Sequence, residues 1–172
     1  YRVSKTKGNY NNHWGVPFTI FGLNEGDEVA VIEMGISDFG EMDVLSNIAA
    51  PDIVVMTNIG QSHLEYLKTR DGILKAKSEV FNHMNPEGHV IVNVDDDKLS
   101  TIRNVNGKKP EYYGFGPQAQ VTAERIKENG FNGSEFDVVI RRGGGKMSFR
   151  AYLPAAGRHM IYNALAAVQV AL

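Results

Sequence analysis

The sequence predicts an α/β fold, in which a parallel sheet with helices on both faces is joined by a small antiparallel patch near residues 121–153. Three observations support this prediction. Short apolar, β-branched runs alternate with helical patterns through the first hundred residues, three strand-like runs then follow with only turns between them, and an alanine-rich segment closes the chain. Alternation of strands with helices favours parallel βαβ units, whereas strands joined by turns favour antiparallel pairing.

Three runs are expected to form the parallel strands, namely Glu28–Met34, Ile53–Asn58 and His89–Val94. Each is rich in valine and isoleucine and lacks a clean alternation of apolar and polar residues. This texture is typical of strands that are buried on both faces.

Two helical patterns lie between these strands, over Glu41–Ala49 and Asp71–Met84. Asp71 is expected to cap the second helix, because aspartate readily accepts a hydrogen bond from a free backbone N–H at a helix start. The helical period places six residues of that segment on one face: Ile73, Leu74, Lys77, Val80, Phe81 and Met84.

The last third of the chain predicts the antiparallel patch and a closing helix. Val121–Lys127, Glu135–Arg142 and Lys146–Leu153 are the three strand-like runs, and glycine-rich turns separate them. Gly157 precedes the helix expected over Tyr162–Leu172.

Two glycine-rich segments imitate phosphate-binding motifs. Arg142–Ser148 resembles a phosphate loop, but Ile140 and Met147 stand where that motif needs glycine and serine or threonine. The segment also lies between two predicted strands, so a hairpin turn is the better interpretation. Gly114–Gly116 lacks both a third glycine and a following helix, and it is expected to be only a turn.

Composition excludes several classes of protein. The 172 residues are 42% hydrophobic, which suffices for one well-buried domain, and the net charge of −2 gives no case for nucleic acid or anionic membranes. The chain has no cysteine, which excludes disulfides and thiolate metal sites and fits a cytoplasmic protein. No apolar run approaches the ~20 residues that span a bilayer. Because the chain starts at Tyr1 and stops at Leu172 inside a helical pattern, we expect a single domain that is a piece of a longer protein.

Polar residues follow the first two predicted strands. Glu33 ends one, and the loop Thr57–Glu65 carries Asn58 and His63 beyond the other. The carboxyl ends of parallel strands form the ligand crevice of such sheets, and neutral imidazole is a common metal ligand. Taken singly, a solvated glutamate and a surface histidine remain the simpler interpretations.

Two further features carry possible chemistry. Lys77 lies on the apolar face of its helix, where a lysine must be paired, modified or shifted in pKa, unless its stem packs while its ammonium reaches water. Asp95–Asp97 follow the third strand and could bind a metal, but a turn with a helix cap is the favoured interpretation.

Taken together, these segments resemble the ATP-dependent Mur ligases of peptidoglycan synthesis. The matching motifs occur in the family's order: the strand with Glu33, the TNIGxxHLE loop, the AKxE helix with Lys77, the NVDD strand end and the GRHMIYNALAA segment from Gly157. The opening Lys5–Pro17 is most similar to the members that add D-alanyl-D-alanine to UDP-MurNAc-tripeptide.

The resemblance implies a P-loop NTPase-like central domain with ATP and Mg²⁺ as cofactors. Phosphorylation of the peptide carboxylate would give an acyl phosphate, which the amine of D-Ala-D-Ala attacks. Glu33 and His63 would be magnesium ligands, together with Lys77 as a carbamate, and His63 and Lys77 would take part in catalysis. The nucleotide would contact Asn163 and His159. The peptide substrate would lie toward three asparagines, Asn11, Asn12 and Asn58.

The sequence departs from the family pattern in two ways. Met160 replaces the first asparagine of the GxHNxxN motif, which affects part of the nucleotide contact. The family's phosphate loop would lie upstream of Tyr1, and the UDP-binding and C-terminal domains are likewise expected outside this chain, so we expect the chain alone to be inactive. Two alternatives stay open, a related ligase of the folylpolyglutamate or cyanophycin type and a non-catalytic nucleotide-binding module.

Overall fold

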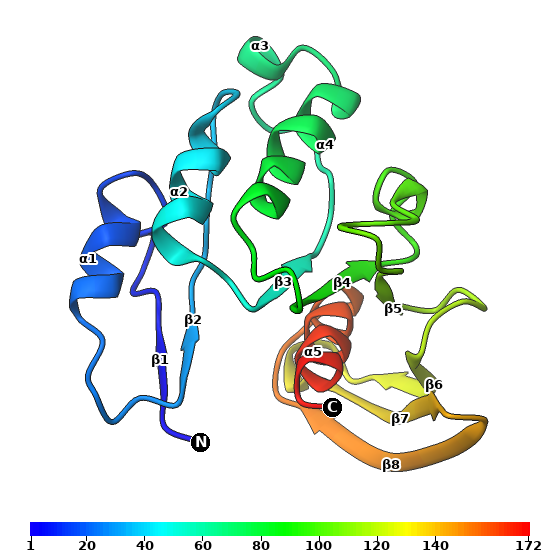
Figure 1. Ribbon diagram of the computed structural model, residues 1–172. Coiled ribbons are helices and arrows are strands. Elements are labelled where there is room, and N and C mark those ends of the chain that lie inside the picture. Colours follow the sequence, from blue (N-terminus) through cyan, green and yellow to red (C-terminus); the bar gives the residue numbers. More distant parts are fainter. The chain divides into compact units, whose positions relative to one another are not determined.

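The computed structural model describes residues 1–172, and the chain divides into two compact units. The first unit comprises Tyr1–Asp52 and Gly60–Gly88. The second comprises Ile53–Ile59 and His89–Leu172. Figure 1 shows the elements of each unit coloured along the chain.

The first unit combines a two-stranded parallel sheet with four α-helices and one 3-10 helix. Strand β1 (Val3–Lys5) pairs with β2 (Val29–Val31). The helical elements are α1 (Gly15–Phe21), α2 (Glu41–Ala49), α3 (Leu64–Leu67), α4 (Arg70–Ser78) and the 3-10 helix η1 (Glu79–Asn82). Helix α2 packs against α4 and η1, and this helical layer holds much of the buried apolar surface.

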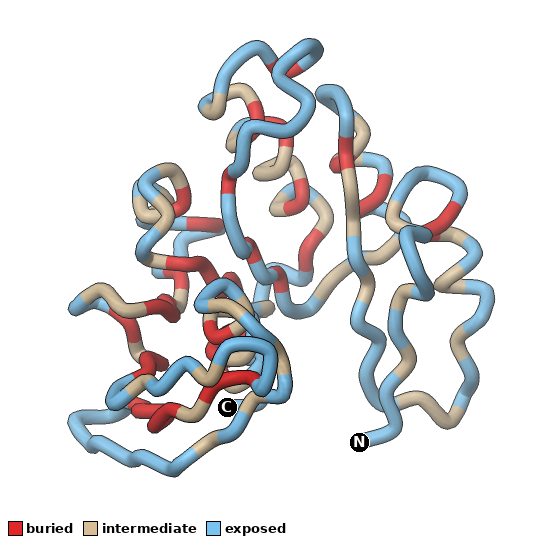
Figure 2. Tube along the Cα trace, turned by 180° about the vertical axis from the view of Figure 1, so that it is seen from behind, coloured by how far each residue is buried: buried red, intermediate tan, exposed pale blue.

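The expected burial of the first strand is wrong. Val29 and Val31 of β2 are 37% and 56% exposed, because β2 pairs with β1 alone in a sheet of two strands. Figure 2 shows β1 and β2 in pale blue and tan, the colours of exposed and intermediate residues. The apolar residues of β2 therefore do not contribute to the core of the first unit.

The helix predicted over Asp71–Met84 differs in its start and its end. Its N-cap is Thr69, whose hydroxyl accepts from the Gly72 N–H at 3.0 Å, so the prediction of Asp71 as the cap is wrong. Threonine and aspartate both serve as caps, and the chain's extended conformation at Thr69 decides between them. The helix tightens into η1 after Ser78 and stops before Met84.

The second unit is built on a six-stranded sheet with the order β3-β4-β5-β6-β7-β8. Its elements are β3 (Ile53–Met56), β4 (His89–Asn93), η2 (Leu99–Thr101), β5 (Glu111–Tyr113), β6 (Val121–Glu128), η3 (Gly130–Asn132), β7 (Ser134–Arg142), β8 (Gly145–Leu153) and α5 (Arg158–Val170). Pairing is parallel from β3 to β6 and antiparallel from β6 to β8. The predicted α/β fold with an antiparallel patch is confirmed.

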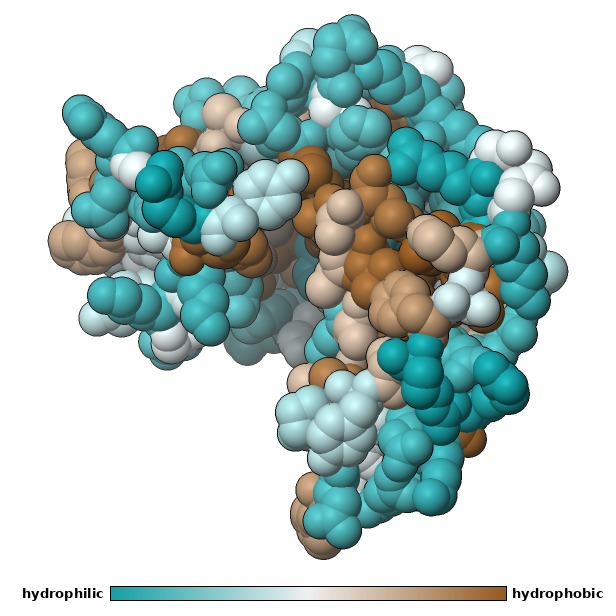
Figure 3. All heavy atoms as spheres, turned by 90° about the horizontal axis from the view of Figure 1, so that it is seen from below, coloured by the Kyte–Doolittle hydropathy of each residue, from teal (hydrophilic) through white to brown (hydrophobic).

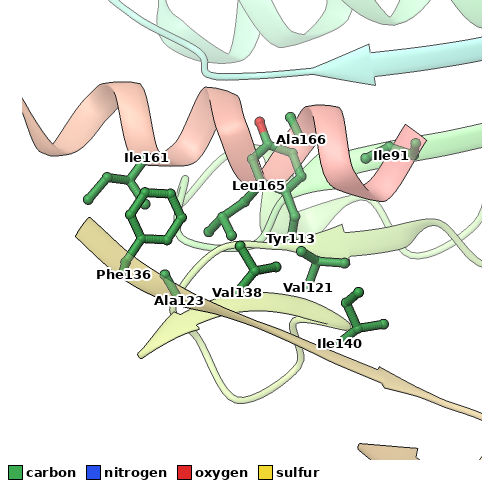
Figure 4. Packing of buried hydrophobic residues seen from close by; sticks show 10 residues of the cluster. All are labelled: Ile91, Tyr113, Val121, Ala123, Phe136, Val138, Ile140, Ile161, Leu165 and Ala166. Atoms are coloured by element: carbon green, nitrogen blue, oxygen red, sulfur yellow. The ribbon is translucent and has the colours of Figure 1, made fainter. Parts of the chain in front are cut away.

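The core of the second unit lies between this sheet and α5. The helix contacts β4, β5, β6 and β8, and it begins at Arg158, earlier than the predicted start at Tyr162. Figure 4 shows the side chains that meet there. The buried cluster consists of Ile91, Tyr113, Val121, Ala123, Phe136, Val138, Ile140, Ile161, Leu165 and Ala166.

Both glycine-rich segments that resemble phosphate-binding motifs are turns, as predicted. Gly143 and Gly144 form a two-residue hairpin loop with φ of +58° and +79°, which is the conformation that tight hairpins require. Gly114–Gly116 follows β5 and leads into no helix.

Apolar side chains also reach the surface, as the brown areas of Figure 3 show for one face. In the first unit they include three aromatic residues at the start and along one side of α1, Trp14, Phe18 and Phe21, which are 69%, 64% and 85% exposed. None of the helices combines the length and apolar character needed to cross a membrane.

Candidate functional site

Glu33 is held at the end of β2 by contacts from the opening segment. Its backbone N–H donates to the Thr6 hydroxyl at 2.9 Å, and Thr6 in turn donates its N–H to the Val31 carbonyl. The side-chain amide of Asn11 donates to Glu33 Oε1 at 2.7 Å. The glutamate is exposed, so its carboxylate is both oriented and accessible.

The segment that carries Asn11 lies directly against the strand end. The Gly35 N–H donates to the Asn11 carbonyl at 2.7 Å. A Cβ at Gly35 would come within 2.9 Å of Asn11 Nδ2, so only glycine allows this approach without displacing the asparagine side chain. Glycine in the Glu33-Met34-Gly35 motif is thus explained by close packing.

Asn12 has a structural contact of its own. Its Oδ1 accepts from the N–H groups of Gly15 and Trp14, at 2.9 and 3.1 Å, where α1 begins. These bonds satisfy N–H groups that lack partners within the helix. Asn12 therefore organises the start of α1, whatever it contributes to substrate binding.

His63 stands in a conformation that is uncommon for a residue with a side chain. Its φ is +62°, it is exposed, and it immediately precedes α3. Residues with side chains in this region cost free energy and concentrate at functional sites. Four other residues with side chains share this conformation, namely Ala50, Lys68, Asn106 and Arg125, so it does not by itself mark His63 as a site residue.

In the second unit, the end of β4 anchors the strand-to-loop turn that carries Asn58. The Ile59 N–H donates to Asp96 Oδ2 at 2.9 Å, and Asn93 donates its amide to the Thr57 carbonyl at 3.1 Å. Asp96 Oδ1 also accepts from the Lys98 and Leu99 N–H groups, which confirms the predicted turn after β4. Asn58 itself is exposed.

Helix α4 presents its two lysines differently. Lys77 is half-buried on the same side as the buried Ile73 and Val80, whereas Lys75 is exposed, with its Nζ 5.8 Å from the Phe39 ring centroid. This agrees with the predicted apolar face around Lys77.

The glutamate of the AKxE motif has a role that the sequence did not reveal. Both carboxylate oxygens of Glu79 accept from the Gly40 N–H, at 3.0 and 2.9 Å. Gly40, with φ of +80°, is the residue from which α2 starts. A carboxylate at a helix N-terminus is favourable for both hydrogen bonding and the helix dipole, so Glu79 ties α4 to the start of α2.

His159 and Asn163, the predicted nucleotide contacts, are exposed in the first turns of α5. The Asn163 amide approaches the sulfur of Met160 at 3.7 Å, so the residue that departs from the family pattern is its neighbour. Gly157, with φ of +96°, allows the His159 ring to fold back, since a Cβ there would lie 2.6 Å from that ring.

An aromatic group supports the start of α5. The Phe115 N–H donates to Asp95 Oδ2 at 2.5 Å, and the Phe115 ring meets Tyr162 edge-on with centroids 4.7 Å apart. The Arg158 guanidinium lies 4.7 Å from the Phe115 ring centroid. Burial, followed by the negative charge of Asp95, raises the pKa of Tyr162 to about 12, so its hydroxyl stays protonated.

The predicted site residues fall into two sets. Glu33, His63 and Lys77 belong to the first unit with Asn11 and Asn12, while the second unit holds the other three, Asn58, His159 and Asn163. Strands β2 and β3, which precede Glu33 and His63, belong to different sheets. That Glu33 and His63 bind the same magnesium ion stays a prediction.

Residues 1–171 match the Mur ligase middle domain. The chain belongs to the Mur ligase family. The UDP-N-acetylmuramoyl-tripeptide–D-alanyl-D-alanine ligase of Bacillus subtilis is 38% identical over 168 residues, which cover 98% of this chain and 35% of that protein. This chain thus spans about a third of the length of the curated relatives it matches.

Solved structures of the family superpose on the whole chain. MurF from Acinetobacter baumannii matches with a TM-score of 0.85 and 36% identity, covering 99% of this chain and 36% of that one. MurF from Thermotoga maritima in complex with ADP matches with a TM-score of 0.82 and 26% identity, covering 98% and 38%. The α/β architecture is therefore that of a Mur ligase middle domain.

Proposed function

We propose that the full-length protein is an ATP-dependent ligase that joins D-alanyl-D-alanine to UDP-MurNAc-tripeptide in the cytoplasm. The observation that carries this proposal is the opening segment, which is most similar to that subtype and which contacts Glu33 through Asn11. The 38% identity to the Bacillus subtilis enzyme supports the same substrate pair.

The proposed reaction has two steps. A carboxylate oxygen of the tripeptide attacks the γ-phosphorus of ATP, the bond to ADP breaks, and an acyl phosphate forms. The amine of D-Ala-D-Ala then attacks the acyl carbon, the amide bond forms with loss of an amine proton, and phosphate leaves. Asn163 and His159 would hold the nucleotide, and Asn11, Asn12 and Asn58 would line the path of the peptide.

The exposed carboxylate of Glu33 supports a magnesium site in the first unit. Glu33 offers an exposed carboxylate already oriented by a hydrogen bond, and oxygen ligands are those that Mg²⁺ prefers. We assign Glu33, His63 and carbamylated Lys77 as its ligands. When bound, Mg²⁺ neutralises phosphate charge during transfer.

Carbamylation of Lys77 is part of the proposal. The neutral amine adds to CO₂, an N–C bond forms, one proton is lost, and the side chain becomes an anion. The half-buried position of Lys77 on the apolar side of α4 supports this proposal. In full-length protein with ¹³C-bicarbonate, Mg²⁺ and ATP, we expect a carbamate ¹³C signal that disappears in Lys77→Arg and persists in Lys75→Arg. Persistence of the signal in Lys77→Arg contradicts the assignment.

A screen of amine substrates tests the ligase assignment. Full-length protein with Mg-ATP and UDP-MurNAc-tripeptide should release phosphate with D-Ala-D-Ala and not with glutamate. Transfer of glutamate to a folate instead would favour the folylpolyglutamate type, and no turnover with any amine would favour a nucleotide-binding module. Glu33→Ala should lower turnover by about 100-fold or more, because a metal ion held by Glu33 would stabilise charge mainly in the transition state.

The nucleotide site is expected to be incomplete within the 172 residues. No phosphate-loop motif occurs among them, and backbone amides and the lysine of that loop supply much of the affinity for phosphate. Calorimetry of this chain with Mg-ATP should therefore show no tight binding. A micromolar dissociation constant would contradict this expectation.

A further inference from the structure

We propose that Asn11 is a positioning residue, which orients the Glu33 carboxylate as a ligand for the divalent cation. This inference rests on the proposed function, because it takes Glu33 as a ligand. It gives Asn11 a role beyond the substrate contact that the family resemblance implies.

The contact between the two side chains is short and directional. Asn11 Nδ2 donates to Glu33 Oε1 at 2.7 Å, which is the length expected for a hydrogen bond to a charged acceptor. The bond joins residues 22 positions apart in the chain. It engages one carboxylate oxygen, and the other oxygen can face a cation.

Main-chain hydrogen bonds hold Asn11 in place. The Asn11 N–H donates to the Asn9 carbonyl at 2.7 Å, and the Asn11 carbonyl accepts from Gly35, two residues beyond Glu33. The Glu33 N–H is bonded to Thr6 from the same opening segment. The bond from the Glu33 N–H to the Thr6 hydroxyl and the main-chain bond from Gly35 to Asn11 therefore hold the two segments together, and this sets the distance across which the amide reaches the carboxylate.

An amide suits this task better than a charged group. The primary amide of asparagine donates without adding a positive charge, so Glu33 keeps its full negative charge for a cation. A lysine or arginine at this place would neutralise the ligand, and an aspartate would repel it. Hydrogen-bonded partners of metal ligands typically change metal affinity by about 10- to 100-fold when they are removed.

The test uses full-length protein with ADP and measures Mn²⁺ binding by electron paramagnetic resonance. Asn11→Ala should weaken Mn²⁺ binding by about 10-fold or more. Asn47→Ala, an exposed asparagine on α2 in the same unit, is the matched control and should leave the affinity unchanged. Circular dichroism of each variant establishes that the fold persists.

A double-mutant cycle separates positioning from direct binding. If Asn11 acts through Glu33, adding Asn11→Ala to Glu33→Ala should cause little further loss of Mn²⁺ affinity, because the coupled residues are not additive. Additive losses, or a loss confined to the KM for the peptide substrate, would overturn the inference.

Gly35→Ala provides a second route that keeps Asn11 in the chain. The new Cβ would lie 2.9 Å from Asn11 Nδ2 and should push that side chain off Glu33. We expect it to reproduce the weakened Mn²⁺ binding of Asn11→Ala, and unchanged affinity in both variants would overturn the inference.

The two failures can be told apart. If Glu33→Ala weakens Mn²⁺ binding and Asn11→Ala does not, only the positioning role fails. If neither variant changes Mn²⁺ binding, Glu33 is not a ligand, and the metal site of the proposed function fails with it.

Discussion

The two units place similar strands in opposite environments. In the second unit β4 is almost wholly buried, with Val92 at 0% exposure, because strands flank it on both sides and α5 covers it. In the first unit Val31 of β2 is 56% exposed, and the buried residues lie among the helices instead. An apolar, β-branched run therefore identifies a strand, but its neighbours in the sheet decide how much free energy its burial contributes.

The largest expected effect tests the core of the second unit. Leu165→Ala removes a fully buried side chain between α5 and the sheet, and such changes cost about 2–5 kcal/mol of stability. Urea unfolding followed by circular dichroism measures this loss. A cost below about 1 kcal/mol would mean that α5 is not the main cover of the sheet.

A matched pair of valines tests the comparison directly. Val92→Ala should lower the free energy of unfolding by about 2 kcal/mol, whereas Val31→Ala should change it by less than about 0.5 kcal/mol. The same two methyl groups are deleted in each case, so the difference measures burial alone. Equal costs would show that β2 is covered in solution.

The comparison of the two units also shows which parts of the structure the sequence could predict. The bounds of α2 and the three antiparallel strands follow from local signals, since Gly40 and the Gly143–Gly144 turn mark where elements change. Strand β5 was missed because its three residues carry no periodic pattern. The expected burial on both faces was wrong for β2 and also for the edge strand β3, where Ile53 and Val55 are 39% and 37% exposed, because the sequence does not state which strands will be their neighbours.

The candidate site also has a part that the sequence could predict and a part that it could not. The order of motifs shared with the family indicated Glu33, His63 and Lys77 as candidates, and of the three only Lys77 is an unusual residue type for its place in an element. The contacts of Asn11 with Glu33 and of Glu79 with Gly40 join residues 22 and 39 positions apart. Such pairs depend on tertiary packing, which no local pattern reveals.

A smaller effect is expected at the start of α4 in the first unit. Thr69→Ala removes the side-chain cap and should cost about 1 kcal/mol. Asp71→Ala, at the position that the sequence suggested, should cost less, because Asp71 lies inside the first turn. Thermal unfolding of the two variants compares them, and a larger loss for Asp71→Ala would restore the original assignment.

The smallest effect concerns the antiparallel patch and depends on pH. Hydrogen bonds from Arg150 and then Arg125 hold the pKa of Asp137 below its ordinary value of 3.8. The folded state therefore gains stability from the ionised carboxylate above that value, and this gain disappears as the pH falls through the lowered pKa. Asp137→Asn should reduce the urea midpoint near neutral pH, and the difference should shrink in acid. A difference that is constant with pH would contradict the ion-pair explanation.

Trp14 is the only tryptophan in these 172 residues, and it lies three positions after Asn11. Its backbone N–H donates to the Asn12 side chain at the start of α1. With 69% of its surface exposed, its indole emits from a largely aqueous environment. A molecule that settles on the opening segment would shield the ring from water and move its emission toward shorter wavelengths. The chain thus carries its own optical reporter beside the Asn11–Glu33 contact, and it can be read without attaching a dye.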